Sequence, residues 1–571
     1  MKRINYILFA MLLFTAVSCR KEFLEKNPQG ELSEEQVQTQ DGVEAALTGA
    51  YSLLNGNTNG TWGNYASGPS QWLLGEVTSD NAHKGSDNGD QPNMNLLERH
   101  SPTSTNDNLS VMWTRCFEGV QRCNNTLRLL AAVQAAPSGQ FSAARATEIQ
   151  AEARLLRGHY YFFLARAFKN VPLITETTTE AVVDNTADIY PQIVADLQFA
   201  VENLPDASPR GQVGRVNKVA AQAYLGKVLL YQKNYAEALP LFNAVIASRP
   251  NITTLSFTDN FDILKENGPE SIFAVQHSVG ADGSGGDNGN VGDMLNFPYG
   301  NGLPITCCGF FQPTLDLANS FKVNAQGLPY LENNAYRENP YISDLGLSLP
   351  QKAAYQVDRT LRIDPRMDYT LGRRGVPYRD WGLMGGDSWI RESSNGGPFV
   401  TMKNSIEASQ ITTGTGPGNT NITGLNVNLI RLGDVYLMAA ECEVELGNLT
   451  RALELVNNIR TRAGRLPAKV VGGAPIANYV VSLYPSFPNA AYARNAVRFE
   501  RRLELALEGH RFYDLVRWGV LKPTLESYFA FEGGYFSYLR GIVIDPADEY
   551  FPIPQEQIDR SNQVLKQNPG Y

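Results

Sequence analysis

Residues 218–250 carry the spacing of a tetratricopeptide repeat, a helix–turn–helix unit of about 34 residues. The positions that define the repeat are Gly226, Tyr235, Ala238, Phe242 and Pro250. Small residues at Gly226 and Ala238 would let the two helices approach closely, and Phe242 would fill the groove between them. The pattern therefore predicts a packed pair of helices in this part of the chain.

A second match occupies residues 435–464, with its key positions at Ala440, Gly447, Leu449 and Ala452. Two isolated repeats cannot bury their own apolar faces, so we expect neighbouring helices to supply the missing layers. Helical periodicity predicts such helices at 72–78, 111–133, 148–168, 189–204 and 493–518.

The segment 148–168 has its apolar positions on one face, and its arginines Arg154, Arg157 and Arg166 lie elsewhere on the helix. Trp72 and Trp113 also fall in helical pattern, and we assign both rings to the core.

The helical pattern is interrupted by a long irregular segment. Residues 280–302 are rich in Gly, Asp and Asn, and irregular sequence continues to about Gly424. Aromatic residues are spread through it: Tyr299, Phe310, Phe311, Tyr378, Trp381 and Trp389. So much loop in a compact protein indicates a function for the loops. The fold class expected is all-α dominated: tetratricopeptide-like helix pairs form a scaffold that carries a long, irregular, loop-rich insertion.

The N-terminus has the pattern of an export signal sequence. Lys2 and Arg3 precede an apolar run at 6–17 that is too short to span a bilayer, and Ala16 and Ser18 then precede Cys19. This is the pattern of a bacterial lipobox, in which the cysteine is acylated, although Ala16 stands where Leu is usual. The alternative is an ordinary secretory signal with a chance cysteine. No later segment is long and apolar enough to span a membrane, so we expect a soluble body anchored through Cys19.

Composition excludes one class of partner. The formal net charge is −9 and the pI about 5.3. A protein that binds nucleic acid needs a basic surface to release counterions from phosphates, so we expect no nucleic-acid partner.

Several motifs in the C-terminal half resemble the SusD/RagB family, named for the D component of the starch-utilisation system. They are NLIRLGDVYL at 428–437, ERRLEL at 500–505, EGHR at 508–511, DLVRW at 514–518, FPIP at 551–554 and QNPGY at 567–571. Asp364-Pro365-Arg366 is similar to another family landmark in the loop region. The motifs occur in the family order, and the resemblance is weakest in the loop insertion.

The resemblance implies a SusD-like fold on the cell surface, held in the outer membrane by its lipid anchor. It also implies a partner, a SusC-like TonB-dependent transporter that the protein caps like a lid. The expected regions are a signal peptide at 1–18, an N-terminal helical region at 19–270, and a C-terminal region at 271–571 that contains the loop insertion. The expected function is non-catalytic glycan binding and delivery to the transporter, with no cofactor.

Three alternatives remain open. Within the same family, the ligand could be a peptide or glycopeptide. A surface glycoside hydrolase would need a pair of carboxylates at a set separation. A tetratricopeptide adaptor without a small ligand would have no reason to carry the aromatic insertion.

Aromatic rings and polar side chains in loops are the candidate ligand site, because sugars stack an apolar face on rings and pair hydroxyls with polar groups. The predicted ligand-binding residues are Trp62, Asp80, Asn81, Tyr299, Trp381 and Trp389. Asp80 and Asn81 follow the 72–78 helix, where family members often place ligand contacts. Each Trp has the alternative of anchoring a loop or filling the core.

Other clusters receive structural interpretations. Glu500, Glu504 and Glu508 are interleaved with arginines, so we predict an ion-pair network on a helix rather than a hydrolase site. Asp282, Asp287 and Asp293 lie in a Gly-rich stretch that would suit Ca²⁺, but the spacing departs from an EF-hand and we predict no metal.

The cysteines are also given structural roles. Cys116 and Cys123 are two helical turns apart, and we expect small core residues. Cys307 and Cys308 are adjacent, so a vicinal disulfide is an option there.

Overall fold

The computed structural model describes residues 37–56, 65–279, 288–300, 303, 305–341, 343–416 and 419–571. The predicted lipidation site Cys19 and the candidate Trp62 lie outside these ranges, as do Asp282 and Asp287. Among the described helices, none combines the length and apolar character that a membrane span requires.

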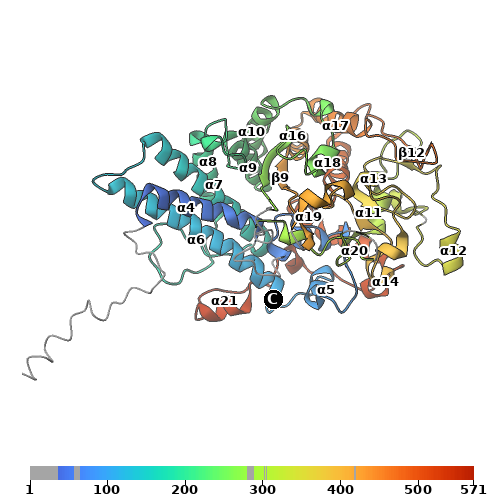
Figure 1. Cartoon of the computed structure of the whole chain (residues 1–571), viewed down its shortest axis with the longest axis horizontal. Helices are drawn as coiled ribbons and strands as arrows, with labels where there is room; N and C mark the ends of the chain where they lie inside the picture. The colour runs from blue at the N-terminus through green and yellow to red at the C-terminus, as the bar shows by residue number, and fades with distance from the viewer. Residues whose placement is uncertain are drawn as a thin grey trace, which may run out of the picture.

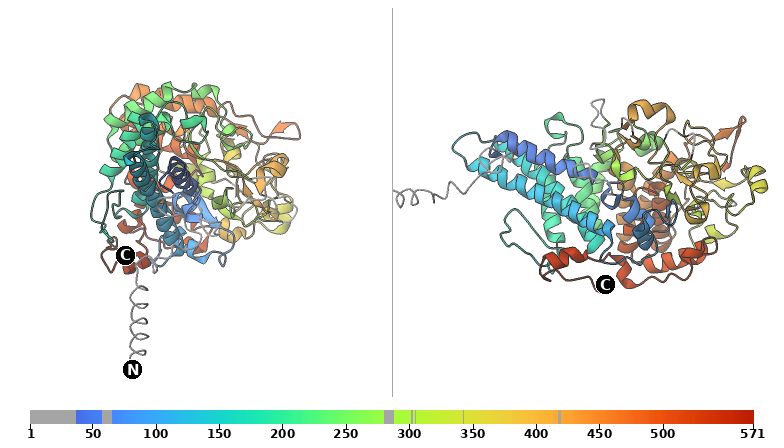
Figure 2. Two further views of the ribbon diagram at one scale, coloured as in Figure 1. Left: turned by 60° about the vertical axis from the view of Figure 1, so that its left-hand side comes forward. Right: turned by 60° about the horizontal axis from the view of Figure 1, so that its bottom comes forward.

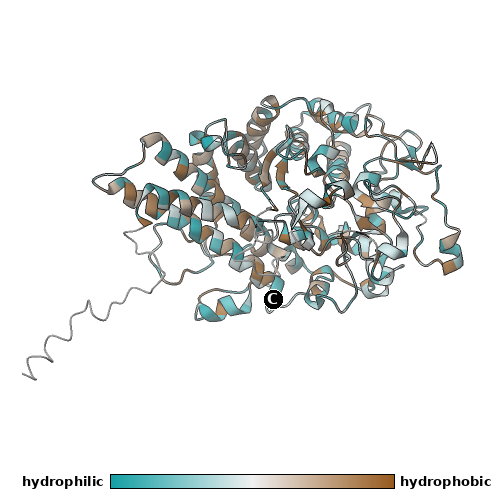
Figure 3. Cartoon of the chain, in the orientation of Figure 1, coloured by the Kyte–Doolittle hydropathy of each residue, from teal (hydrophilic) through white to brown (hydrophobic). Residues whose placement is uncertain are grey.

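Long helices gather at one end of the molecule (Figure 1). They are α4 (Gln40–Ser52), α6 (Asp107–Ala135), α7 (Ala143–Phe168) and α8 (Tyr190–Asn203). Side chains cap the N-termini of α6 and α7: the Asn106 amide oxygen accepts from the N–H of Asn108, and the Ser142 hydroxyl accepts from that of Arg145. The helices expected at 111–133, 148–168 and 189–204 are confirmed. Hydrophilic and hydrophobic residues alternate along the outer helices, as expected for helices with one buried face (Figure 3).

The tetratricopeptide-like unit is formed by α9 (Lys218–Tyr231) and α10 (Tyr235–Ala247). A Cβ atom on Gly226 would lie 2.6 Å from Cε1 of Phe242, so the ring occupies the space that the glycine leaves open. The second unit is α16 (Leu432–Glu445) with α17 (Leu449–Ala463). The two units pack on each other through α10 and α16, and α8 covers α9. Both helix pairs and the expected extra layers are therefore confirmed.

The single helix predicted at 493–518 is wrong. The chain forms α18 (Ala490–Leu505) and α19 (Arg511–Arg517), with a break between them. Leu507 and Gly509 take left-handed backbone angles of +66° and +79°, which end a right-handed helix. The freed N–H groups of Gly509 and His510 donate to the carboxylate of Glu76 at 2.8 and 3.0 Å. Glu76 lies in the π-helix η3 (Trp72–Val77), so a distant segment stabilises the break.

The opposite end of the molecule holds short elements joined by long loops, and two further views show the same division (Figure 2). The strands pair two by two: β1 (Ala82–Gly85) with β3 (Phe310–Pro313), β2 (Ser271–Val275) with β9 (Val427–Arg431), β4 (Arg362–Ile363) with β12 (Asn478–Tyr479), β5 (Leu371–Gly372) with β6 (Val400–Thr401), β7 (Thr415–Gly416) with β8 (Asn419–Thr423), and β10 (Val470–Val471) with β11 (Ala474–Pro475). The β4–β12 pair is parallel and the others are antiparallel.

The remaining α-helices are short. They are α5 (Pro92–Glu98), α11 (Leu315–Ser320), α12 (Leu349–Ala353), α13 (Met367–Thr370), α14 (Ser393–Gly396), α15 (Ile411–Gly414), α20 (Leu521–Glu532) and α21 (Gln555–Arg560). The molecule is thus an α-helical scaffold with a loop-rich insertion, which confirms the expected all-α dominated fold class.

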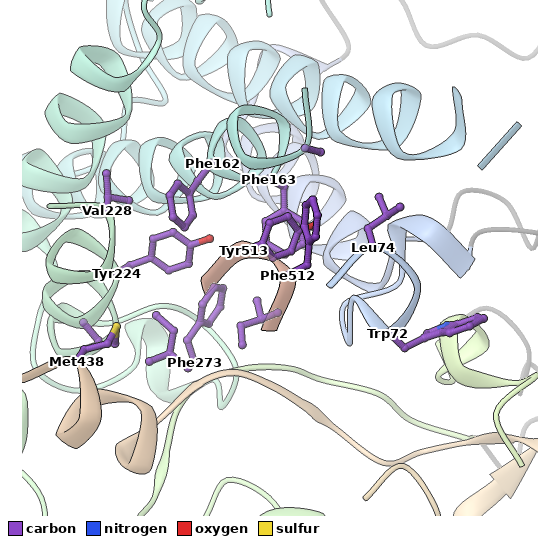
Figure 4. Packing of buried hydrophobic residues seen from close by; sticks show 14 of the residues in the cluster. Trp72, Leu74, Phe162, Phe163, Tyr224, Val228, Phe273, Met438, Phe512 and Tyr513 are labelled. Atoms are coloured by element: carbon purple, nitrogen blue, oxygen red, sulfur yellow. The ribbon is translucent and has the colours of Figure 1, made fainter. Parts of the chain in front are cut away.

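A continuous apolar core joins the helices to the insertion. Phe162 and Phe163 of α7 face Phe512 and Tyr513 of α19, with Tyr224 of α9 beside them (Figure 4). Trp72 and Trp113 are 0% and 3% exposed, which confirms both core assignments. The core includes residues on both sides of position 270, and the region boundary predicted there stays a prediction.

Two of the three arginines that the sequence places away from the apolar face of 148–168 are buried. Arg157 and Arg166 are buried, because α7 lies among α4, α6, α8 and the C-terminal elements and is covered on nearly all sides. Arg157 pairs with Asp196 of α8 at 2.7 Å. The helix is therefore central to the scaffold.

A buried ion-pair network fastens the insertion to the scaffold. Arg366 of the insertion donates to Glu500 at 2.6 Å and to Glu504 at 3.0 Å, and both carboxylates belong to α18. Glu504 also pairs with Arg431 at 2.7 Å, and Arg462 contacts the same carboxylate. The predicted ion-pair network on this helix is confirmed, and it is buried rather than solvated.

Two of the predicted structural roles for the cysteines, buried free thiols and a vicinal disulfide, are found in the structure. Cys116 and Cys123 of α6 are buried free thiols, and burial raises the pKa of Cys116 to about 12. Cys307 and Cys308 form a vicinal disulfide.

Candidate loop site

A turn after β1 builds one side of the candidate site. The carboxylate of Asp87 accepts N–H bonds from Gly89 at 2.8 Å and Asp90 at 2.9 Å. The Lys84 ammonium donates to the backbone carbonyls of Asp87 and Asp90 at 2.6 and 2.7 Å, which holds the turn from below. The turn therefore presents two acidic side chains in a fixed geometry.

Tyr299 forms the opposite side. Its ring is 43% exposed, and its N–H donates to the carbonyl of Trp389 at 2.8 Å. The Arg391 guanidinium lies 5.2 Å from the ring centroid. Gly309 lies under both residues, because a Cβ there would come within 3.2 Å of Cβ of Tyr299 and 3.5 Å of Cβ of Arg391.

Arg391 joins the two sides. It pairs with Asp87 at 2.5 Å and Asp90 at 2.6 Å and donates to the Ser86 hydroxyl at 2.9 Å. The three charged side chains are each 30% exposed. We call Tyr299, Arg391, Asp87 and Asp90 the loop site. It offers one exposed ring, one guanidinium and two carboxylates to solvent.

Trp381 and Trp389 lie behind Tyr299 rather than beside it at the surface. Trp389 is 8% exposed and packs edge-on against Tyr378 at 5.3 Å, which corrects its expected exposure. Trp381 is half-buried, and its indole N–H donates to the carbonyl of Ile406 at 2.8 Å. Both rings border a hollow of about 10 Å³, too small for a sugar ring. They support the loop that carries Tyr299, and their predicted ligand role stays a prediction.

Asp80 and Asn81 are buried at 0% and 1% exposure, away from solvent. Arg511 donates to both carboxylate oxygens of Asp80, at 2.7 and 2.9 Å, and Arg502 donates to the Asn81 amide oxygen at 2.9 Å. Burial opposes ionisation, but Arg502 and Arg511 hold the pKa of Asp80 well below its usual range. In this conformation both residues connect β1 to the C-terminal helices instead of facing a ligand.

A much larger cavity lies elsewhere in the described part of the chain. It is a groove of about 970 Å³ between α4, residues 210–215 and β2, large enough for an oligosaccharide. Its charges pair internally: Arg145 with Glu44 at 2.8 Å, and Arg215 with Glu152 at 2.8 Å. The one ring among its described lining residues is Tyr51, whose hydroxyl donates to Glu152 at 2.8 Å and whose ring contacts the Arg215 guanidinium at 5.5 Å. Tyr299 is more exposed, so we favour the loop site for sugar stacking.

Within the described ranges, no group of three or more His, Cys, Asp or Glu side chains is arranged to hold a metal ion. Asp293, the described member of the candidate calcium set, is buried and accepts hydrogen bonds from Ser70 at 2.5 Å and Asn290 at 2.7 Å.

Arg391, Asp87 and Asp90 were not among the ligand-binding residues predicted from the sequence. Arg391 lies 301 positions after Asp90, and no local pattern links them. The one available signal was the turn composition at 87–90, in which Asp, Asn and Gly favour a tight turn.

Fold and site together define a helical-repeat scaffold that presents a polar and aromatic surface built from inserted loops. The chain belongs to the SusD family, whose model matches residues 269–571. A second family model, described as starch-binding associating with outer membrane, matches residues 22–230.

Individual relatives agree with this assignment. SusD-like protein P25 of Formosa agariphila is 25% identical, with 100% of both chains covered. A solved laminarin-binding SusD-like protein is 25% identical, covering 93% of this chain and 100% of that one, with a TM-score of 0.65. Surface glycan-binding protein A of Bacteroides fluxus shares the fold, with 22% identity, 93% and 100% coverage and a TM-score of 0.67.

Proposed function

We propose that this protein binds glycan at the cell surface and delivers it to a SusC-like TonB-dependent transporter, without chemistry of its own. The observation that carries the proposal is the exposed ring of Tyr299, bordered by Arg391 and two carboxylates. A ring can stack on the C–H face of a sugar, while the guanidinium and carboxylates hydrogen-bond to its hydroxyls. The similar solved protein whose name records laminarin binding supports the same ligand class.

The charges of the loop site suit binding better than hydrolysis. Slight burial raises the pKa of Asp87, but the N–H groups of Gly89 and Asp90, together with Arg391, outweigh this effect. The pKa of Asp87 is therefore held below its usual range. A glycosidase acid needs the opposite, a raised pKa and a proton to donate. Glu500 and Glu504 are occupied by buried arginines and do not reach solvent. These features support a non-catalytic role.

The anchor and the partner extend the proposal. The apolar run that precedes Cys19 supports acylation of that residue, and the family description of outer-membrane association supports the location. A binding protein tethered at a transporter mouth raises the local ligand concentration without needing high intrinsic affinity. We therefore expect a Cys19→Ala variant to leave the membrane fraction, and unchanged membrane retention would contradict the anchor.

Native affinity electrophoresis through gels that contain single polysaccharides, laminarin first, tests the ligand and the site. We expect retardation of the wild type, and at least a tenfold weaker interaction for Tyr299→Ala. Tyr571→Ala is the matched control, because it removes the ring of another exposed tyrosine (38% exposed) that is not part of the loop site. Retardation that persists in Tyr299→Ala but disappears in Gln212→Ala/Gln276→Ala would move the ligand to the groove, whose lining includes both glutamines.

The second candidate ligand is a peptide or glycopeptide. Asp87, Asp90 and Arg391 could pair with charged peptide groups as well as with hydroxyls. Absence of retardation in every polysaccharide gel, combined with binding to a peptide library, would favour this alternative.

A further inference from the structure

Arg166, near the C-terminal end of α7, is a buried cation with no carboxylate of the described residues within ion-pair distance. Its side chain belongs to a residue that is 8% exposed, and its Nε–H donates to the carbonyl of Phe162 at 3.4 Å. The guanidinium is surrounded by rings: Phe162 at 4.5 Å, Phe163 at 4.7 Å, Tyr513 at 4.3 Å and Tyr231 at 5.9 Å. Three of these residues take part in the core shown in Figure 4.

Other buried arginines differ from Arg166 because they form ion pairs. In the described part of the chain, each of them has a carboxylate within ion-pair distance: Arg157, Arg366, Arg373, Arg431, Arg460, Arg462, Arg501 and Arg502. An unpaired buried charge is costly, because the lost hydration is not replaced. Among the described residues, no carboxylate lies within ion-pair distance of Arg166, whose contacts are aromatic rings and the carbonyl of Phe162. An anion from solution is one source of the missing counter-charge.

The ion pairs around Lys227 balance one another. Lys227 pairs with Asp434, Arg501 pairs with Asp434 and Asp514, and Arg517 pairs with Asp514 and Glu441. Three cations therefore meet three carboxylates in this group. Arg166 adds one positive charge to a balanced cluster.

A small cavity adjoins the guanidinium. It measures about 20 Å³, and Arg166, Lys227, His510 and Gln71 are among its lining residues. One water needs roughly 10–15 Å³ of such space, so the cavity has room for one water or one monatomic ion. Glu508 also borders the cavity, but its oxygens are engaged by Arg431 and Lys403.

His510 supplies a second polar group to the cavity. Its backbone N–H donates to Glu76, while its ring nitrogens have no hydrogen bond to the described protein. Burial, with Lys227 and Arg501 nearby, lowers the pKa of its imidazole well below the usual range. The neutral ring retains one N–H donor that can point at an anion.

We propose that this cavity binds a single chloride ion, held by the Arg166 guanidinium and the His510 ring. The ion would complete the junction where α7 and α9 meet the break between α18 and α19. The site is independent of the loop site, so the two proposals can fail separately.

Thermal unfolding of the full chain in sodium chloride and in sodium gluconate at equal ionic strength tests the site. We expect a Tm higher in chloride by about 2 °C or more, rising with chloride concentration as for a ligand of the folded state. Arg166→Met should lose the difference. Arg154→Met is the matched control on the same helix, and it should keep the difference because Arg154 pairs with Asp196 at 2.8 Å.

Equal Tm values in both salts for the wild type would overturn the proposal, as would a chloride effect that survives in Arg166→Met. If Arg166→Met does not fold, wild-type crystals soaked in bromide decide the question. An anomalous peak in the cavity beside Arg166 supports the site, and a cavity filled by water without a peak overturns it.

Discussion

The Glu76 carboxyl is buried with no cation within ion-pair distance among the described residues. It accepts hydrogen bonds from the N–H groups of Gly509 and His510 and from the Asn81 amide at 2.8 Å. Burial raises its pKa to about 7, against the opposing effect of these hydrogen bonds. The pKa of Glu76 is higher in the folded state than in the unfolded chain. The contribution of this carboxyl to the free energy of unfolding is therefore complete below about pH 4.5 and is lost as pH rises through 7.

Glu76→Gln should remove this part of the pH dependence, because the amide resembles the protonated acid. We expect the wild-type free energy of unfolding to lose on the order of 3 kcal/mol from this group between pH 4.5 and 8, and the variant to lose much less. Urea unfolding across this pH range measures the difference. Glu118→Gln, at an exposed helical ion pair, is the control; identical slopes for wild type and Glu76→Gln would refute the assignment.

Individual site residues were the hardest feature to predict. Tyr299 was found because an aromatic residue among turn residues stands out in the sequence. Asp80 and Asn81 resemble surface loop residues, yet arginines from α18 and α19 bury them. Arg391 belongs to the site because it contacts residues that lie about 300 positions earlier in the chain. A single sequence without tertiary information does not reveal such contacts.

At the scale of elements, the close approach of α9 and α10 depends on Gly226. Gly226→Ala places a methyl group against Phe242, and we expect a loss of about 1–3 kcal/mol despite the better helix propensity of alanine. Gly49→Ala in α4 is the matched control, because the nearest atom to its Cβ lies at 3.9 Å and alanine should stabilise by up to about 1 kcal/mol. Chemical denaturation compares the two variants. Equal effects would show that propensity, rather than packing, dominates at Gly226.

Elements with strong local signals were predicted well. The helix pairs at 218–250 and 435–464 have small residues where helices touch, and periodicity located α6, α7 and α8. The break after α18 was missed because its cause is not local. Gly509 lies against the backbone of Ser70, where a Cβ would meet the carbonyl oxygen at 2.1 Å, and nothing in the sequence near 509 indicates that contact.

At the scale of the whole molecule, Glu504 joins three segments that are far apart in sequence. Its carboxylate pairs with Arg366 of the insertion, Arg431 of β9 and Arg462 of α17. These arginines hold its pKa well below the usual range in spite of burial. The stabilisation is therefore present above the carboxyl pKa of the unfolded chain, about 4, and is lost as pH falls below it.

Glu504→Gln should lower the free energy of unfolding by about 3–5 kcal/mol at pH 7, since it leaves buried arginines without their counter-charge. Glu445→Gln, which breaks the outer pair with Arg494, should cost less than about 1 kcal/mol. Urea denaturation at pH 7 compares them, and a similar small cost for both would show that the buried network relaxes when one carboxylate is lost.

The contact between Glu76 and Gly509 joins residues that are 433 positions apart, and this separation affects the rate of folding. Isolated helical turns form in about a microsecond, whereas contacts between remote segments wait for a slow search through open conformations. The early helices can assemble while η3 still lacks its partner. We therefore expect the slow step of folding to be the docking of the residues after α18 against η3. A nascent chain that stops before these residues should form its first helices but lack the contact that completes the fold.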